Sequence, residues 1–380
     1  MNALLWMGLC LTIPAVAQKT SWADPPYRPL SEQIPNSIGS LPLFGTIEWT
    51  LDRLPFVPPG PQGGISGQAM TAVGDAVFMA GGYIPAGDET SDRASRETAR
   101  TAFRYVPQTQ TWTQLPNLPA RREYPRGLSD GRYFYVVGGG VQMRGLPVHW
   151  QVASDCYRID TLKPGSSWEG CGSLTVPRSH MAVGRVGRFL IVAGGAQFDY
   201  SQKDPYVRRG TTDVLDLDHP NRGWSVRASI PGVPRAWSAG ASCNGRLYMI
   251  GGLGPVWTEP VFDTLSYDPE KDHWERRAPA PIAAEGWEAG CFANRYVIVT
   301  GGTQHRESGI FWSDLALAYD TKEDRWLRID GAIPGGAVIN DVGIALIGDS
   351  IFAAGAEGPK GTHFYWLRIG RIRPAAGLRD

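Results

Sequence analysis

Short apolar stretches separated by polar turns recur along the chain, and five of them end in a glycine doublet. The five segments are Val77–Gly82, Val136–Gly139, Ile191–Gly195, Met249–Gly252 and Ile298–Gly302. Their first glycines follow one another at steps of 57, 56, 57 and 50 residues, and a shorter sixth copy lies at Ile351–Gly355. Self-similarity at a nearly constant period indicates a repeat architecture in which each repeat forms one structural unit.

Each repeat predicts four short strands. In the fourth copy we expect strands at Ala239–Cys243 and Arg246–Ile250 around an Asn244-Gly245 turn, a third at Thr264–Tyr267, and a fourth around Trp274. The absence of a helical period between the runs favours antiparallel sheets. One such sheet cannot bury both of its faces, whereas six sheets packed around an axis can. The pattern therefore predicts an all-β fold, a six-bladed β-propeller.

A tyrosine, a polar turn and a tryptophan follow most of the doublets. The pairs are Tyr105 with Trp112, Tyr157 with Trp168, Tyr267 with Trp274, and Tyr319 with Trp326. A glycine doublet followed by a spaced Tyr and Trp resembles the kelch repeat, and the resemblance covers roughly residues 46–370. It implies a kelch-type propeller, although the third copy has Leu217 in place of the Tyr and the sixth doublet is eroded.

The two ends of the chain complete this picture. Only one strand, near Phe364–Leu367, is expected after the sixth copy, while an unassigned strand, Thr46–Thr50, precedes the first copy. We therefore predict that the N-terminal strand closes the last blade. The resulting divisions are a signal peptide at 1–17, an extended leader at 18–44, the propeller at 45–372 and a tail at 373–380.

The signal peptide rests on an apolar segment, Leu4–Ala17, that ends in an A-x-A cleavage pattern. The mature chain is expected to be secreted or periplasmic and to have no membrane span. In an oxidising compartment Cys156 and Cys171 could be bridged, while Cys243 and Cys291 are expected to be buried free thiols.

The charge balance narrows the class of partner. Lys plus Arg and Asp plus Glu each number 37, so the formal net charge is zero. A nucleic-acid partner is disfavoured because it requires excess positive charge. The histidines other than His180 are scattered over loops and turns, so no metal site and no cofactor are expected.

Loop lengths indicate which face binds a ligand. Turns such as Asn244-Gly245 are minimal, whereas the segments after the doublets are long and varied, and long loops on a rigid scaffold concentrate binding residues. The connections between blades reach the same face and place several ligand-binding candidates near the axis. These candidates are Arg126, Arg178, His180, Arg235, Trp237 and Trp287.

The same connections supply candidate acids and bases, namely Glu285, Glu288 and Asp341. Arginines suit a carboxylate ligand, a nearby carboxylate can transfer protons, and tryptophans can stack on a sugar ring. Each arginine has an equally strong structural interpretation, in which it bonds the backbone of a neighbouring blade. The carboxylates are likewise open to a role in ion pairs, and His180 to an ordinary hydrogen-bonding role.

Two functional hypotheses follow. An exported kelch protein of this size resembles the sialic acid mutarotases, which implies binding of a carbohydrate or acidic sugar on the long-loop face and a cofactor-free mutarotase or epimerase activity. The alternative is a non-catalytic scaffold whose loops bind a protein or a glycan. Propellers host many functions, so the fold alone does not decide between them.

Overall fold

The computed structural model describes residues 27–55, 64–84, 97–143, 149–201, 205–255, 261–306, 309–334, 342–355 and 366–378, and in these residues the protein is all-β. Helical segments of the described chain are confined to short turns. They are η1 (Leu30–Gln33), α1 (Asn36–Gly39) and η3 (Pro220–Arg222). The strands group into six units, which we number in chain order.

Units 1 to 4 are separate four-stranded antiparallel sheets. Unit 1 consists of β3 (Ala69–Val73), β4 (Ala76–Ala80), β7 (Ala102–Val106) and β8 (Thr111–Leu115). Unit 2 consists of β9 (Arg126–Ser129), β10 (Tyr133–Val137), β13 (Asp155–Asp160) and β14 (Glu169–Ser173). Unit 3 consists of β15 (Ala182–Val186), β16 (Phe189–Ala193), β19 (Thr212–Asp216) and β20 (Trp224–Arg227). Unit 4 consists of β21 (Ala239–Cys243), β22 (Arg246–Ile250), β23 (Thr264–Asp268) and β24 (His273–Arg277), which confirms the strands predicted for the fourth repeat.

Units 5 and 6 share one ten-stranded sheet instead of forming two separate sheets. Unit 5 consists of β25 (Glu285–Phe292), β26 (Tyr296–Arg306), β28 (Ala316–Asp320) and β29 (Arg325–Asp330). Unit 6 consists of β30 (Gly343–Ile347), β31 (Ser350–Ala354), β32 (Trp366–Pro374) and β2 (Leu43–Arg53). The sheets merge because β2 pairs antiparallel with β32 and, near its start, parallel with β29.

The N-terminal segment at 46–50 thus pairs with the last strand of the chain, as the sequence pattern indicated. The register runs from Thr46 opposite Arg373 to Thr50 opposite Ile369. The observed strand β2 extends beyond the expected segment on both sides, and β32 begins at Trp366. The earlier part of the predicted last strand lies outside the described residues.

The long segments after the glycine doublets fold partly into two-stranded ribbons. These ribbons are β5 (Tyr83–Ile84) with β6 (Glu97–Thr98), β11 (Gly140–Met143) with β12 (His149–Val152), and β17 (Ala196–Phe198) with β18 (Tyr206–Arg208). In unit 5 the long strand β26 pairs with β27 (Gly309–Trp312), which in turn pairs in parallel with β1 (Tyr27–Pro29).

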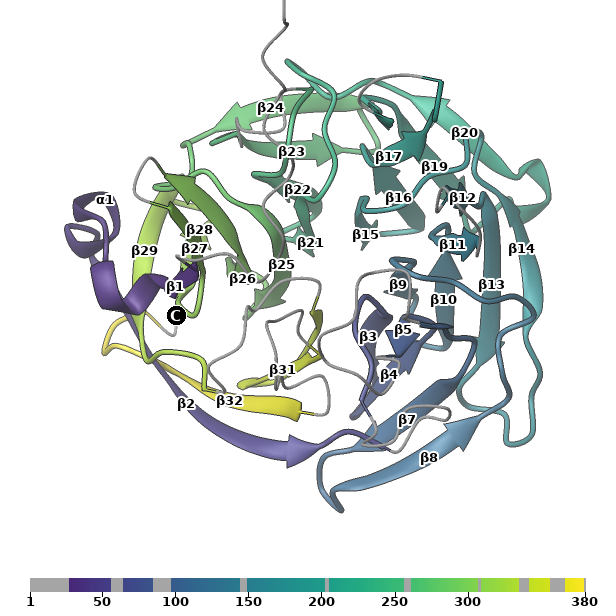
Figure 1. The fold of residues 1–380 in the computed structure, drawn as a ribbon, viewed down its shortest axis with the longest axis horizontal. Helices are drawn as coiled ribbons and strands as arrows, with labels where there is room; N and C mark the ends of the chain where they lie inside the picture. The colour runs from purple at the N-terminus through teal and green to yellow at the C-terminus, as the bar shows by residue number, and fades with distance from the viewer. Residues whose placement is uncertain are drawn as a thin grey trace, which may run out of the picture.

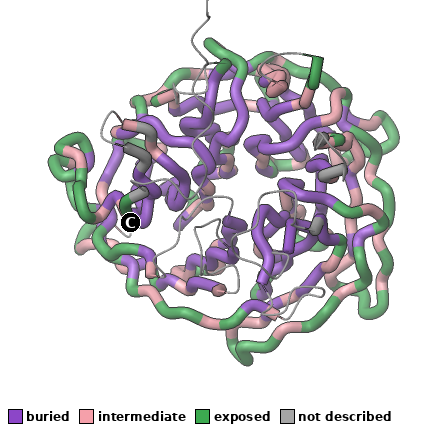
Figure 2. Tube along the Cα trace, in the orientation of Figure 1, coloured by how far each residue is buried: buried purple, intermediate pink, exposed green. Residues whose placement is uncertain are grey.

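The first strands of the units contact one another in the order β3, β9, β15, β21, β25 and β30, and β30 also contacts β3. Figure 1 shows these strands around the middle of the molecule, with later strands of each unit farther out. Second strands such as β4 and β16 are buried along their whole length, whereas the fourth strand β14 is mostly exposed (Figure 2).

A backbone hydrogen bond joins successive units at an equivalent position in each unit. The amide of the second doublet glycine donates to a carbonyl at the start of the next unit. The bonds are Gly82 to Arg122, Gly139 to Arg178, Gly195 to Arg235, and Gly252 to Ala284, with lengths of 2.6, 3.0, 2.9 and 2.9 Å. The approach leaves no room for a side chain, because a Cβ on Gly194 (φ 65°) would lie 2.7 Å from the carbonyl oxygen of Arg235. The doublets are therefore needed where neighbouring units meet.

The tryptophans of the fourth strands provide a second repeated contact. Each indole N–H donates to a backbone carbonyl near the end of the preceding unit. The bonds are Trp112 to Arg53, Trp168 to Pro116, Trp224 to Cys171, Trp274 to Ala228, and Trp326 to Ala278. Because Arg53 lies on β2, the first of these bonds links unit 1 to unit 6.

The described part of the leader packs against unit 5. Leu30 and Ile38 are buried in the same core cluster as Phe311 and Leu317. The hydroxyl and backbone amide of Ser31 both donate to the carboxylate of Asp314. Residues 27–42 therefore extend the core of unit 5 and do not form a core of their own.

The described residues contain two disulfides. Cys156 and Cys171 join β13 to β14 within unit 2, the bridge that the sequence left open. Cys243 and Cys291 join β21 to β25, so the prediction of free thiols at these positions is wrong. The two cysteines lie 48 residues apart in the chain, and only the contact between the first strands of units 4 and 5 brings them together.

Candidate functional site

Strand register aligns the units residue by residue and separates two groups of arginines. Arg122, Arg178 and Arg235 are equivalent, because the backbone carbonyl of each accepts a hydrogen bond from a doublet glycine amide of the preceding unit. Arg126 lies four positions later, on β9. The sequence analysis grouped Arg126 with Arg178 and Arg235 because all three follow a proline, and that grouping is wrong for Arg126.

Arg178 is fully buried inside unit 3 and does not reach the axis. Its guanidinium donates to the Asp213 carboxylate at 2.6 Å and to the Thr211 hydroxyl at 2.9 Å, and also to backbone carbonyls. The Asp213 carboxylate is likewise fully buried and accepts hydrogen bonds from the backbone amide and the hydroxyl of Thr175, at 2.7 and 2.8 Å. Burial lowers the pKa of Arg178 even though Asp213 opposes the shift. The pair joins strands of its own unit.

Arg235 repeats this arrangement in unit 4. It is 1% exposed and donates to Asp263 at 2.6 Å, and burial lowers its pKa. Asp263 is also bound by Arg276 at 2.8 Å. Arg122 pairs with Asp155 in unit 2 in the same way. These geometries support the structural interpretation of the arginines, and they do not bring Arg126, Arg178 and Arg235 into one pocket.

A ring of positive-φ residues lies at the start of the first strands or just before it, and we call it the rim. Its described members are Gly67, Tyr124, His180, Trp237 and Gly286, with φ of 59°, 50°, 56°, 57° and 67°. Rim residues bond across units, since the amide of Trp237 donates to the carbonyl of His180 and the amide of Gly286 to that of Trp237. Bulky side chains rarely adopt this backbone conformation, which costs about 1–3 kcal/mol and is concentrated at functional sites.

The three large rim side chains stack on one another. The His180 ring lies 4.2 Å from the Tyr124 ring and 4.5 Å from the Trp237 ring, centroid to centroid. Its Nδ1 atom lies 2.8 Å from the hydroxyl of Ser179. All three rings are buried. His180 is therefore held as a stacked, hydrogen-bonded ring, in agreement with the more ordinary interpretation of this residue.

Aromatic side chains of the two-stranded ribbons extend this stack into a closed circuit. The circuit runs Tyr124, Trp150, Phe198, Tyr206, Trp237, His180 and back to Tyr124, with Tyr200 beside Phe198. We call these seven residues the aromatic cluster. Trp150, Phe198 and Tyr206 are half-buried and Tyr200 is 38% exposed. The cluster thus combines a buried base with an accessible edge on the long-loop face.

The remaining predicted residues occupy three different environments. Glu285 is buried one position before the rim and accepts the hydroxyl of Thr303 at 3.3 Å. Trp287 is 1% exposed and packs in the core cluster between units 4 and 5. Asp341 lies outside the described residues.

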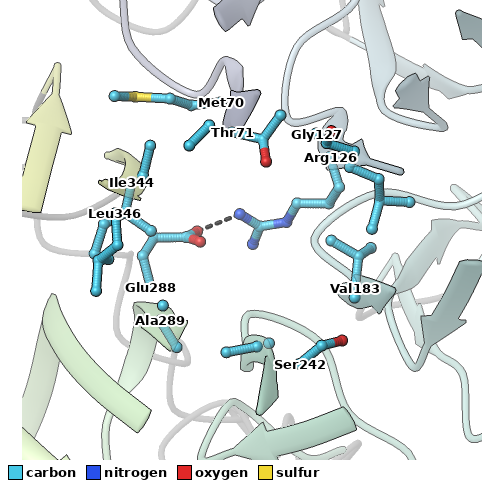
Figure 3. Close-up of a pocket in the computed structure, with 18 of the residues that line it drawn as sticks. Met70, Thr71, Arg126, Gly127, Val183, Ser242, Glu288, Ala289, Ile344 and Leu346 are labelled. Carbon is cyan, nitrogen blue, oxygen red and sulfur yellow. Dashed lines mark hydrogen bonds and ion pairs between the residues drawn. The ribbon is translucent and has the colours of Figure 1, made fainter. Parts of the chain in front are cut away.

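Arg126 and Glu288 meet on the axis. Each unit has one first-strand residue paired with the residue before its first doublet glycine. These six residues are Ala69, Arg126, Ala182, Ala239, Glu288 and Gly343. Two of the six carry long charged side chains, on units 2 and 5, which lie three steps apart in the order of contacts. Figure 3 shows the two side chains directed at each other across the pocket, where Arg126 Nη1 donates to Glu288 Oε1.

The ion pair lies in a cavity of about 370 Å³ lined by the first strands of all six units. The lining is most exposed toward the short hairpin turns, where Arg185 is exposed and Ser129 and Ser242 are half-buried. Gln68, toward the rim, is buried. The accessible end of the cavity therefore faces away from the aromatic cluster.

Burial dominates the electrostatics of this pair. The side chains of Arg126 and Glu288 are only 15% and 12% exposed. Desolvation raises the pKa of Glu288, and the neighbouring Arg126 charge only partly opposes the shift. A carboxyl in this setting can hold or release a proton nearer to neutral pH than an exposed one.

Sequence reasoning missed most of the aromatic cluster. Tyr124, Trp150, Phe198, Tyr200 and Tyr206 were not singled out. The signal that could have found them is the presence of aromatics in the long segments at 141–154 and 197–211, where the sequence analysis considered only length.

Among the described residues, no group of three or more His, Cys, Asp and Glu side chains is placed to hold a metal ion. No helix in this part of the chain is long and apolar enough to cross a membrane. No protein-family model matches the chain.

Proposed function

We propose that the six units are the blades of an exported, kelch-type β-propeller that binds a carbohydrate at the aromatic cluster. Support for the propeller comes from the order of first-strand contacts, from β2 pairing with β32, and from the repeated glycine and tryptophan bonds between units. Two disulfides support export to an oxidising compartment, secreted or periplasmic.

The observation that carries the carbohydrate proposal is the accessible aromatic edge above a strained, buried base. Aromatic faces stack on the apolar faces of sugar rings, and the tyrosine hydroxyl groups of the cluster suit the hydroxyl groups around such a ring. Trp150 lies on β12 of one ribbon, whereas Phe198 and Tyr206 lie on β17 and β18 of the next, and the rings of Trp150 and Tyr206 both pack against the ring of Phe198. Rings from two neighbouring ribbons thus form one surface.

The geometry favours binding over sugar isomerisation. The mutarotase hypothesis relied on three arginines and a carboxylate in one pocket, and Arg178 and Arg235 instead pair with Asp213 and Asp263 inside their own units. We therefore propose binding without catalysis at the long-loop face. A protein-binding scaffold is the competing outcome of the test.

The test is a glycan array of neutral and acidic sugars, followed by calorimetric titration of the best ligand. Trp150→Ala and Tyr206→Ala are each expected to weaken binding at least tenfold, because each removes a stacking ring. Tyr133→Ala is the matched control, since Tyr133 lies beside the short turn at 130–132 on the opposite face, and it should change affinity by less than twofold. Failure to bind any glycan, or equal affinity in all three variants, would favour the scaffold.

A further inference from the structure

The axial ion pair leaves hydrogen-bonding capacity unused. Arg126 donates to Glu288 through Nη1, while its Nε is buried without a hydrogen-bond partner among the described residues. A guanidinium has five N–H donors and binds a carboxylate best through two parallel bonds. An unused donor beside a cavity of about 370 Å³ indicates that a second acceptor can bind there.

We propose that this cavity binds the carboxylate of a small organic anion on Arg126, and that Glu288 takes up one proton from solvent as the anion binds. The site is separate from the aromatic cluster and opens toward the short hairpin turns. Its size falls within the usual range for small-ligand pockets, about 300–1,000 Å³, and leaves room for several carbon atoms beyond the carboxylate.

The proton uptake follows from the charges in the cavity. Among the lining residues, the charged ones are Arg126, Glu288 and the exposed Arg185 at the open end. Cys291 also lines the cavity but is held in a disulfide and does not titrate. A second carboxylate beside ionised Glu288 would place two negative charges on one arginine, which is unfavourable where solvent is scarce. Protonation of Glu288 removes one charge and supplies an O–H that donates to the bound anion.

The sequence around the ring agrees with a binding role for the pair. The four equivalent residues in the other units are Ala or Gly. Because these side chains are small, they leave the cavity open beside the two charged side chains. Burial also raises the pKa of Glu288, which lowers the cost of adding the proton.

Acetate is the probe. Its binding to the full chain is measured by saturation-transfer NMR titration at pH 5.8 and pH 7.8. Wild-type protein should bind acetate at least tenfold more tightly at the lower pH, because a proton enters with the anion. Acetamide, the neutral isostere, should bind at least tenfold more weakly than acetate at pH 5.8. No saturation transfer to acetate at either pH, or equal binding of acetamide, would overturn the proposal.

Variants assign the effect to these residues. Glu288→Gln should bind acetate at pH 7.8 as tightly as wild type does at pH 5.8, with no remaining pH dependence, because glutamine mimics the protonated acid. Arg126→Met should lose binding at least tenfold. Since that variant buries an unpaired carboxylate, the double variant Arg126→Met with Glu288→Leu provides a folded version that should also fail to bind.

Arg185→Gln is the matched control for a nonspecific positive charge. It should change acetate affinity by less than twofold, because the side chain is exposed at the open end of the cavity. Loss of binding in Arg185→Gln together with unchanged binding in the double variant would show that acetate binds elsewhere and would refute the site.

Discussion

Replacing Arg178 with methionine tests whether the equivalent arginines of units 2 to 4 stabilise the units that contain them. The substitution removes the partner of Asp213, which is fully buried and keeps only the amide and hydroxyl of Thr175. Breaking a buried pair from one side costs about 3–5 kcal/mol. Unfolding entropy is about 2.1 cal/mol/K per residue, or roughly 0.8 kcal/mol/K for 380 residues, so the thermal midpoint should fall by about 4–6 °C.

The equivalent pairs supply an internal scale. The partner carboxylates Asp213, Asp263 and Asp155 are 0%, 29% and 43% exposed, and Asp263 keeps a second partner in Arg276. Methionine should therefore destabilise most at Arg178, less at Arg235 and least at Arg122 when the midpoints are measured by scanning calorimetry. The double variant Arg178→Met with Asp213→Leu should recover most of the loss, because no buried charge remains unpaired. A midpoint for Arg178→Met within 1 °C of wild type would refute the structural role.

Two further predictions concern the disulfides and the axial carboxylate. Replacing both cysteines of the Cys243–Cys291 bridge with serine should cost about 4 kcal/mol and those of Cys156–Cys171 about 3 kcal/mol, because the first bridge closes a separation of 48 residues and the second one of 15. Denaturant unfolding measures both, and a larger loss from the shorter bridge would contradict the chain-entropy argument. For Glu288, the raised pKa means that the native state binds more protons than the unfolded state, so its contribution to stability is complete below the ordinary carboxyl pKa and is lost as the pH rises through the native pKa. Wild type should thus lose stability relative to Glu288→Gln as the pH rises from the ordinary carboxyl pKa toward the higher native pKa, by at most about 1.4 kcal/mol per pH unit, and a pH-independent difference would contradict the shift.

Local patterns predicted the strands well. Around Asn244-Gly245 the short runs of strand-forming residues and the turn residues specify β21 and β22 at their observed bounds. A hairpin of this kind depends on neighbouring residues only, so its signal lies within about ten positions of the chain. The pairing of the segment at 46–50 with the last strand was also predictable, because a unit lacking one strand needs a partner.

The repeated Pro-Arg dipeptide led to a wrong alignment, because it occurs at different positions relative to the first strand of each unit. Pro125-Arg126 resembles Pro177-Arg178, yet Arg126 lies on the first strand while Arg178 lies before it. The four-residue difference places one arginine in the cavity between the first strands and the other in an ion pair within its own unit. Likewise, nothing near Cys243 or Cys291 in the chain reveals that their strands are neighbours.

The amino-acid sequence by itself determined the repeat, the strands within it and the need for a terminal strand to complete the last unit, because these depend on short-range alternation and turn chemistry. The tertiary structure alone decided which side chains meet. Arg126 and Glu288 are 162 residues apart and belong to units three steps apart, so their contact exists only after all six first strands are assembled. The aromatic cluster has the same origin, since its rings come from two ribbons and from the rim residues of units 2, 3 and 4, and they stack only where neighbouring units meet.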